Sequence, residues 1–168
     1  MSKYYGKYRG TVIQNVDPEQ LGRIQAMVPD VSGLLPSSWA MPCVPIAGKQ
    51  SGVYVVPQIG AGVWIEFEQG DPDYPIWSGG YWGVAAEVPA LALAGNPASP
   101  SIVLGSILQN TLCISDVPGP TGGIMIKSTT GAMIVVNDVG ITISNGKGAT
   151  IVLAGPTVTI NNGALVVT

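Results

Sequence analysis

Short apolar alternations fill the stretch from residue 123 to residue 168. In each of them a β-branched or leucine residue stands at every second position, which is the pattern of a strand with one buried face. Gly, Asn or Pro ends each run after about three to five residues, which is short for an ordinary strand. The runs are Ile124/Ile126, Ile134/Val136, Ile141/Ile143, Ile151/Leu153, Val158/Ile160 and Leu165/Val167.

The alternations belong to a repeat of 17 residues: laying 123–139 over 140–156 matches 7 positions, and a third, shorter copy begins at Thr157. One copy buries almost nothing, so copies must stack to form a core. Because one chain supplies few strands, we predict that three chains wind about one axis as an intertwined β-helix, with a monomeric solenoid and a sandwich as alternatives. The expected trimer core is Ile124, Ile126, Ile134, Val136, Ile141, Ile143, Ile151, Leu153, Val158 and Ile160. Val and Ile would point inward, and Thr, Ser, Asn and Lys outward.

The N-terminal half carries longer apolar runs separated by turns rich in Gly and Pro. We expect strands at 8–16, 24–28, 39–45, 52–57, 63–67 and 76–82. Short strands with glycine corners suit an OB-type barrel. All four Trp residues lie in this half, which makes it the larger hydrophobic core.

Composition narrows the class of protein. Only 10% of the 168 residues are charged, whereas 23 are Gly and 14 are Pro, which favours an all-β fold. The net charge of −3 argues against nucleic-acid binding, as does the scarcity of basic residues between Thr11 and Gly83, where only Arg23 and Lys49 occur. No apolar run approaches the length of a transmembrane helix. The N-terminus lacks a hydrophobic signal core, so we expect no export by the general secretory route.

Catalysis is not expected. The chain has no His, so the usual pairing of a nucleophile with a base is missing. The densest acidic cluster is Glu66, Glu68, Asp71 and Asp73, which could hold calcium or work as paired carboxylates. A solvated strand face followed by a turn is the favoured interpretation of this acidic cluster.

We expect no cofactor, and we interpret Cys43 and Cys113 as small buried residues, not as a disulfide.

Two separate motifs resemble a known family. NVDPEQLGRIQAMVP (15–29) and GVYVVPQIGAGVWIEFEQGDPDYPIWSGGYWG (52–83) are similar to the OB domain of the baseplate assembly protein V, or central spike, of contractile phages. This group is related to the spikes of type VI secretion and of contractile injection systems. We interpret the matching residues as turn and corner positions: Asp17, Pro18, Gly22, Arg23, Gly60, Gly70, Asp71, Pro72 and Pro75.

The resemblance implies a homotrimer that pierces the envelope of a target cell when a sheath contracts. Residues 1–83 would be an OB-fold domain bound to a baseplate hub protein, 84–100 a linker, and 101–168 the β-helix spike, whose first strands would be 102–104 and 112–114. Such a protein is not an enzyme and is located in the baseplate of a particle assembled in the bacterial cytoplasm. The alternative is a monomeric β-solenoid adhesin or surface-binding module.

Two features depart from some members of the family. The linker is too short for the lysozyme-like domain that some carry, and the lack of His excludes the histidine-ligated iron tip of others. The apolar C-terminal residues Leu165, Val166, Val167 and Thr168 are candidates for contact with a separate PAAR-type tip protein. The candidates for hub contact are Tyr4, Tyr5, Tyr8 and Arg9, since Tyr and Arg are enriched at interfaces; a frayed or capping N-terminus is the alternative.

Overall fold

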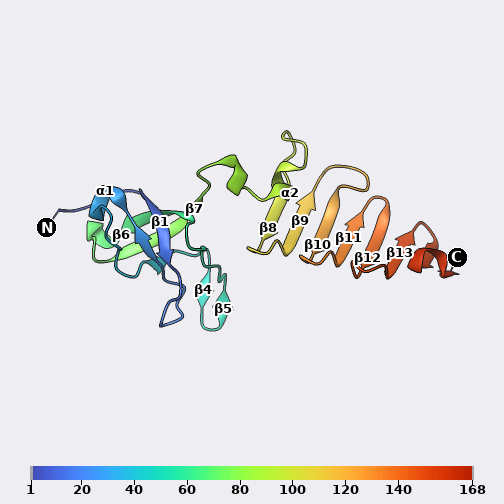
Figure 1. Cartoon of the computed structure of the whole chain (residues 1–168), viewed down its shortest axis with the longest axis horizontal. Helices are drawn as coiled ribbons and strands as arrows, with labels where there is room; N and C mark the ends of the chain where they lie inside the picture. The colour runs from blue at the N-terminus through green and yellow to red at the C-terminus, as the bar shows by residue number, and fades with distance from the viewer. Residues whose placement is uncertain (1, 168) are drawn as a thin grey trace. The chain divides into compact units, whose positions relative to one another are not determined.

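The computed structural model describes residues 2–167, without the side chain of Val166. Nearly all of its regular secondary structure is β-strand, which confirms the expected all-β class. The chain divides into two compact units, Met1–Ala85 and Ala86–Thr168 (Figure 1). We describe each unit by itself.

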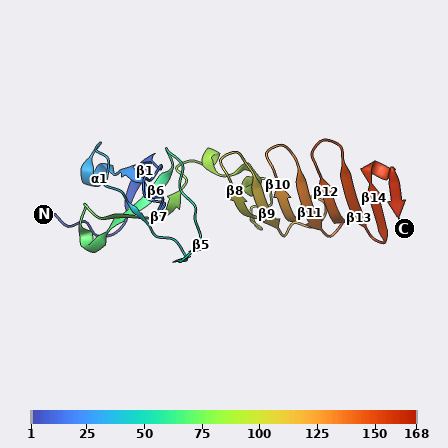
Figure 2. The ribbon, with the colours of Figure 1, turned by 90° about the horizontal axis from the view of Figure 1, so that it is seen from below.

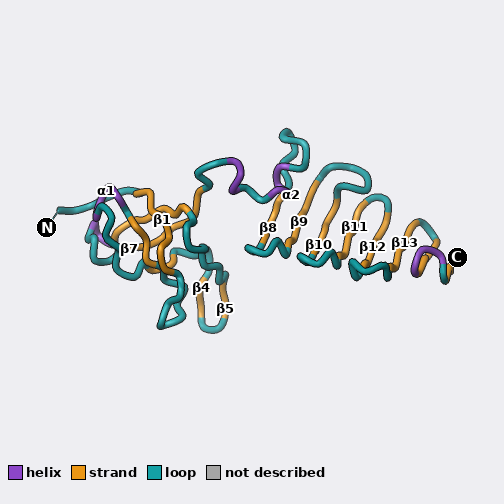
Figure 3. The backbone as a smooth tube through the Cα atoms, in the orientation of Figure 1, coloured by secondary structure: helices purple, strands orange, loops and turns teal. Residues whose placement is uncertain are grey.

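The first unit is a curled five-stranded sheet of the kind expected for an OB domain. Its strand order is β2-β1-β6-β7-β3, and all neighbours are antiparallel except β3 and β7. The strands are β1 (Tyr8–Gln14), β2 (Gln25–Met27), β3 (Met41–Pro42), β6 (Gly62–Phe67) and β7 (Pro75–Tyr81). A hairpin of β4 (Ala47–Gly48) and β5 (Ser51–Gly52) stands beside the sheet, and the helical turns α1 (Pro29–Ser32) and η1 (Glu68–Gly70) connect strands (Figure 3).

Alternation along the strands builds the core of this unit. In β6 the residues Val63, Ile65 and Phe67 are buried, whereas their neighbours Trp64 and Glu66 are only partly covered. The same period of two residues is what a strand with one face on a core requires. The buried cluster contains Val12, Ile24, Ala26, Val28, Ala40, Val63, Ile65, Phe67 and Trp77.

One predicted strand of the first unit is wrong. The segment 52–57 forms no ladder beyond Gly52, and Val53, Tyr54 and Val55 are exposed. Its apolar residues are consecutive and do not alternate with polar ones, so the pattern does not specify a strand with one buried face. The strand expected at 39–45 shrinks to β3. Beyond β3 the Cys43 N–H still donates to the Trp77 carbonyl at 2.9 Å, but Pro45 has no N–H with which to continue the pairing.

The second unit is an antiparallel ladder of eight strands in sequence order, as Figure 2 shows. The strands are β8 (Ile102–Gly105), β9 (Thr111–Ser115), β10 (Gly123–Lys127), β11 (Met133–Asn137), β12 (Gly140–Ser144), β13 (Thr150–Ala154), β14 (Thr157–Ile160) and β15 (Leu165–Val167). The helical turns η2 (Ala85–Glu87) and α2 (Ala90–Leu93) precede them, and η3 (Asn161–Gly163) joins the last two. Each apolar run of the repeat has become one strand.

Glycine permits the close approach of neighbouring strands in the ladder. Gly140 begins β12 with a φ of +150°, and a Cβ there would lie 2.0 Å from the carbonyl oxygen of Leu153. Gly123, the equivalent residue one repeat earlier, would place a Cβ 2.1 Å from the carbonyl oxygen of Val136. The glycines that start the first two copies of the repeat, Gly123 and Gly140, are therefore a steric requirement of strand pairing.

Candidate functional site: association and docking surfaces

The main candidate site is one face of the ladder, which is lined throughout by aliphatic side chains. Pairing between neighbouring strands places these side chains in two columns that run along the ladder. The first column is Ile102, Ile114, Ile124, Val136, Ile141, Leu153, Val158 and Val167; the second is Leu104, Leu112, Ile126, Ile134, Ile143, Ile151, Ile160 and Leu165. We call these 16 residues the apolar ladder face.

The apolar ladder face is not covered within a single chain. Most of its side chains are exposed, from Leu153 at 37% to Leu104 at 64%. Soluble monomers rarely expose a continuous apolar patch of this extent, and such patches mark association surfaces. All ten residues of the predicted trimer core lie on it. The other six are Ile102, Leu104, Leu112 and Ile114, which show the same alternation, and Leu165 and Val167, which are among the predicted tip contacts.

The opposite face of the ladder has a different composition. Its central column is Val103, Cys113, Met125, Val135, Thr142, Val152 and Thr159, with Lys127 and Ser144 beside it. The expected placement of Thr, Ser and Lys on this side agrees with the register. The expectation that Val side chains point inward does not hold for Val103, Val135 and Val152. These three lie on the opposite face, in the same column as Thr142 and Thr159. Within one chain this central column is half-buried, and Cys113 is buried, so it is more covered than the apolar ladder face.

The ends of the ladder differ from its interior. Strands β9 to β14 use both hydrogen-bonding edges within the chain, while β15 pairs only with β14 in the described residues. Of the predicted tip residues, Leu165 and Val167 are exposed and continue the apolar ladder face. The backbone of Val166 pairs with Thr159, and Thr168 lies outside the described residues.

In the barrel, the first family motif forms a charged cluster below the surface. The buried carboxylate of Asp17 accepts hydrogen bonds from the backbone N–H groups of Glu19 at 3.0 Å and Leu21 at 2.8 Å. The guanidinium of Arg23 donates to the same carboxylate at 2.6 Å and lies over the ring of Trp39. The Arg23 hydrogen bond holds the pKa of Asp17 well below its usual range, and Asp17 raises the pKa of Arg23.

The remaining family-motif residues are located at turns, as their residue types predict. Gly22, Gly60 and Gly70 have positive φ, and the indole N–H of Trp77 donates to the Gly22 carbonyl at 3.1 Å. Pro18 and Pro72 lie in turns, Pro75 is fully buried at the start of β7, and Asp71 accepts from the backbone N–H of Asp73. These contacts stabilise the fold, and none of them forms a chemical site.

The four candidates for hub contact divide into two pairs. Tyr4 and Tyr8 pack against the core, with ring centroids 6.0 Å and 5.7 Å from that of Phe67. Tyr5 is exposed. Arg9 is also exposed, and its guanidinium stacks over the rings of Trp64 and Tyr81. Tyr5 and Arg9 are therefore the two members of the set whose side chains are exposed.

The acidic cluster is divided between strand β6 and the turn that follows it. Glu66 points out from β6, where the Ser78 hydroxyl and the Lys7 ammonium hold its pKa below the usual range. Asp71 pairs with Lys3 at 3.7 Å in the turn before β7. Within residues 2–167 no three His, Cys, Asp or Glu side chains are grouped so as to hold a metal ion.

The two cysteines are free thiols. Cys113 is buried, as expected, but the expectation that Cys43 is buried is wrong, because it follows the short strand β3 on the exposed side of the barrel. Among the described residues no helix is long and apolar enough to cross a membrane.

Comparison with known proteins assigns both units. Residues 8–82 match the model of the type VI secretion system/phage-baseplate injector OB domain. Residues 101–166 match the model of the phage baseplate V C-terminal trimerisation domain. A search of curated proteins finds no match to the chain. The two matches agree with the barrel and with the exposed apolar face of the ladder.

Proposed function

The chain belongs to the phage baseplate V family, a family of structural baseplate proteins that self-associate through a C-terminal trimerisation domain, and on this premise we propose that it is a membrane-piercing central spike. The machine would be a contractile phage tail baseplate or a contractile injection system. The observation that carries the proposal is the apolar ladder face, which requires a partner along its full length.

The ladders of three chains would meet at a common axis through their apolar faces. Complete burial of a Val, Leu or Ile side chain stabilises by about 1.5–3 kcal/mol, and a half-exposed one still has about half of that to gain. Summed along 16 positions, the gain is large compared with the cost of bringing three chains together. The inward residues would be the predicted trimer core together with Ile102, Leu104, Leu112, Ile114, Leu165 and Val167.

Each chain would supply one side of the spike. Because β9 to β14 already pair on both edges within the chain, the contacts between chains would be made by side chains and not by shared ladders. The winding of the three chains about one another stays a prediction. The rod would expose few strand edges through which it could aggregate. It would also carry few charges, since Asp138 and Lys147 are the only charged residues beyond residue 127.

The barrel would act as the adaptor to a baseplate hub protein. We retain Tyr5 and Arg9 as the contact residues, with Tyr4 and Tyr8 supporting them from the core. At the other end of the chain, Leu165, Val166, Val167 and Thr168 would bind a PAAR-type tip protein. The free edge of β15 and the exposed side chains of Leu165 and Val167 support this assignment.

The spike would act mechanically: contraction of a sheath would supply the force, and the rod would transmit it to the target cell envelope. The particle would be assembled in the bacterial cytoplasm. The alternative of a monomeric adhesin is disfavoured, because it would leave the apolar ladder face in water and because the matched domain is a trimerisation domain.

A matched pair of variants tests the trimer. We expect light scattering of the full chain to give the mass of three chains of 17.3 kDa each. Ile143→Glu places a charge in the middle of the apolar ladder face and should reduce the mass to that of one chain. Thr142→Glu, on the opposite face one residue away, should leave the trimer intact. A wild-type chain that stays monomeric at micromolar concentration would refute the proposal.

A further inference from the structure

The barrel has an apolar groove that no part of the described unit fills. It has a volume of about 590 Å³ and lies between the β4–β5 hairpin and the residues around Gly22. The ring of Tyr54 is positioned over Gly22, where a Cβ would come within 3.3 Å of it. Leu21, Met41, Ile46, Val53 and Tyr54 line the groove and are all exposed. We call these five residues the socket.

A second apolar feature protrudes elsewhere on the same unit. Leu34 and Leu35 follow α1 and are 85% and 69% exposed. Gly33, with φ of +62°, turns the chain outward at the end of α1. The Ser32 hydroxyl donates to the Leu35 carbonyl at 2.9 Å, and the Leu35 N–H donates to the Ser32 carbonyl at 3.2 Å. This protrusion, which we call the leucine knob, is therefore held in shape before it meets any partner.

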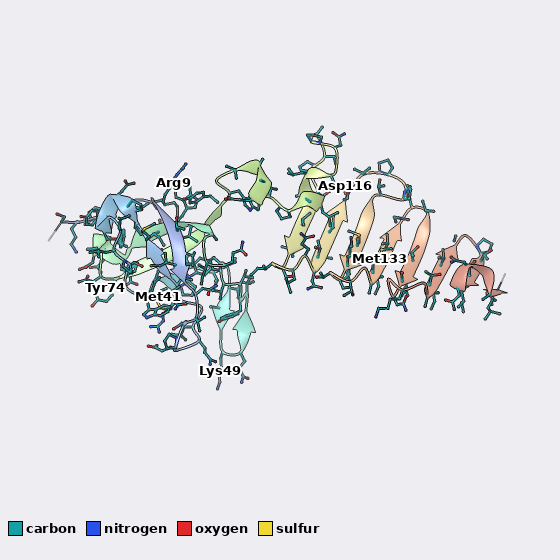
Figure 4. The ribbon with its side chains drawn as sticks, viewed as in Figure 1. Arg9, Met41, Lys49, Tyr74, Asp116 and Met133 are labelled. Carbon is teal, nitrogen blue, oxygen red and sulfur yellow. The ribbon has the colours of Figure 1, made fainter. Side chains whose placement is uncertain are left out.

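Charges of opposite sign flank the two features. Asp30, in α1, is the acidic group nearest the leucine knob in sequence, and Lys49 lies in the turn of the hairpin whose residues Gly48 and Gln50 line the groove. Among residues 2–167, neither Asp30 nor Lys49 takes part in an ion pair, whereas Arg23, Lys3 and Lys7 do. Figure 4 shows Lys49 at the end of the β4–β5 hairpin, well away from Arg9.

We propose that the leucine knob of one chain inserts into the socket of a second copy of the chain, with Asp30 facing Lys49. Threefold association uses two different surfaces on each copy, and such a contact closes into a ring of three when each copy is rotated by a third of a turn, as a trimeric ladder would impose. One unit of this chain carries both halves of such a contact. The inference rests on the proposed trimer, because only the ladder brings the copies together.

Tethering makes a weak contact between barrels sufficient. About 20 residues separate the end of β7 from the start of β8, so three barrels joined to one trimeric ladder would face each other at an effective concentration of about 1 mM. A contact too weak to hold free barrels together would then be occupied in the trimer. Its role would be to order three barrels into one ring-shaped platform.

Cysteine cross-linking of the full chain tests this contact. In a Cys43→Ser, Cys113→Ser background, we expect Leu34→Cys with Tyr54→Cys to oxidise to a covalent trimer on a non-reducing gel. Either cysteine alone should give no such band. Leu34→Cys with Ile59→Cys is the matched control, since Ile59 has similar exposure but does not line the groove.

The charges give a second, independent readout. Asp30→Lys or Lys49→Asp alone should slow cross-linking about threefold, the size of a surface ion pair. The double swap should restore the rate. Unchanged rates in the single swaps would refute the pairing of Asp30 with Lys49.

The outcomes separate this inference from the trimer itself. The contact does not exist if the mass stays at three chains and no covalent trimer forms. It is also refuted if the two cysteines join within one chain. In either case the groove would bind another partner, such as the hub protein. If the wild-type chain has the mass of one chain, both the trimer and the contact are refuted; a background chain is used for cross-linking only if it keeps the mass of three chains.

Discussion

At the scale of single residues, Asp17 organises the turn between β1 and β2 of the barrel. Its carboxylate is buried and accepts from three backbone N–H groups and from Arg23, so the chain reverses around it between β1 and β2. The depressed pKa is a statement about stability. A carboxyl group whose pKa is lower in the folded state stabilises the protein above its unfolded pKa, and that stabilisation is lost as the pH falls.

The first prediction concerns Asp17→Asn. The amide keeps the shape of the side chain but removes the charge that faces Arg23, so we expect the thermal midpoint at pH 7 to fall by several degrees. In the wild type the midpoint should fall as the pH drops below about 4, the usual pKa of an aspartate. In the variant the midpoint should depend less on pH in this acidic range. Trp fluorescence can measure the thermal midpoint of the wild type and of the variant, because Trp39 lies beside Arg23.

Glu19→Gln is the control for Asp17→Asn. Glu19 also pairs with Arg23, at 3.1 Å, but its side chain is exposed, so its removal should change the midpoint little. If Asp17→Asn kept the full acid dependence of the wild type, another carboxyl group would have to be its source.

At the scale of elements, the ladder depends on the glycines that start the first two copies of the repeat, Gly123 and Gly140. Strand β12 follows a two-residue turn at Asp138 and Val139, and Asn137 closes this turn by accepting from the N–H groups of Val139 and Gly140 at 3.0 Å and 3.2 Å. Gly140 then lies against the Leu153 carbonyl with no room for a side chain. The turn and the strand are therefore specified together.

The second prediction is that Gly140→Ala disrupts the ladder from β12 onward. Its Cβ would overlap the Leu153 carbonyl oxygen, and relief requires β12 and β13 to separate. We expect a trimer of lower thermal midpoint, or loss of the trimer in light scattering. Gly155→Asn is the comparison: Gly155 has a φ of +54°, which Asn tolerates, and open space around its Cβ position. Equal loss in both variants would show that the close approach is not the cause.

At the scale of the whole molecule, the two units obtain their stability in different ways. The barrel has its own buried core of nine residues, whereas the ladder carries its apolar residues on a face that one chain leaves open. The barrel is expected to fold by itself, and the ladder only when three chains meet.

The third prediction follows from this difference and from the location of the Trp residues. Trp39, Trp64, Trp77 and Trp82 all lie in the barrel, so fluorescence reports on that unit alone, while far-ultraviolet circular dichroism reports on both. Raising the chain concentration should move the guanidinium midpoint of the ladder upward and leave the fluorescence midpoint nearly unchanged, because association stabilises by mass action. Equal shifts of both signals would mean that the units unfold together.

Much of this architecture is readable from the sequence because its causes are local. Alternation with a period of two residues and a breaker after every run are properties of neighbouring residues, so every apolar run from Ile124 to Val167 became a strand. The turn at Asp17 and Pro18 is predictable for the same reason. The strand prediction for 52–57 is wrong because consecutive apolar residues do not specify which face of a strand is buried.

Pairing and exposure, in contrast, were decided by the tertiary structure. No local pattern states that each strand pairs with the next one in the chain, and that pairing is what aligns 16 aliphatic side chains on one face. Nor does a local pattern separate Tyr8, which packs on Phe67, from Tyr5, which faces solvent. The socket and the leucine knob likewise depend on segments far apart in the sequence. Such contacts are set by which surfaces can be buried together, and that is known only once the chain is folded.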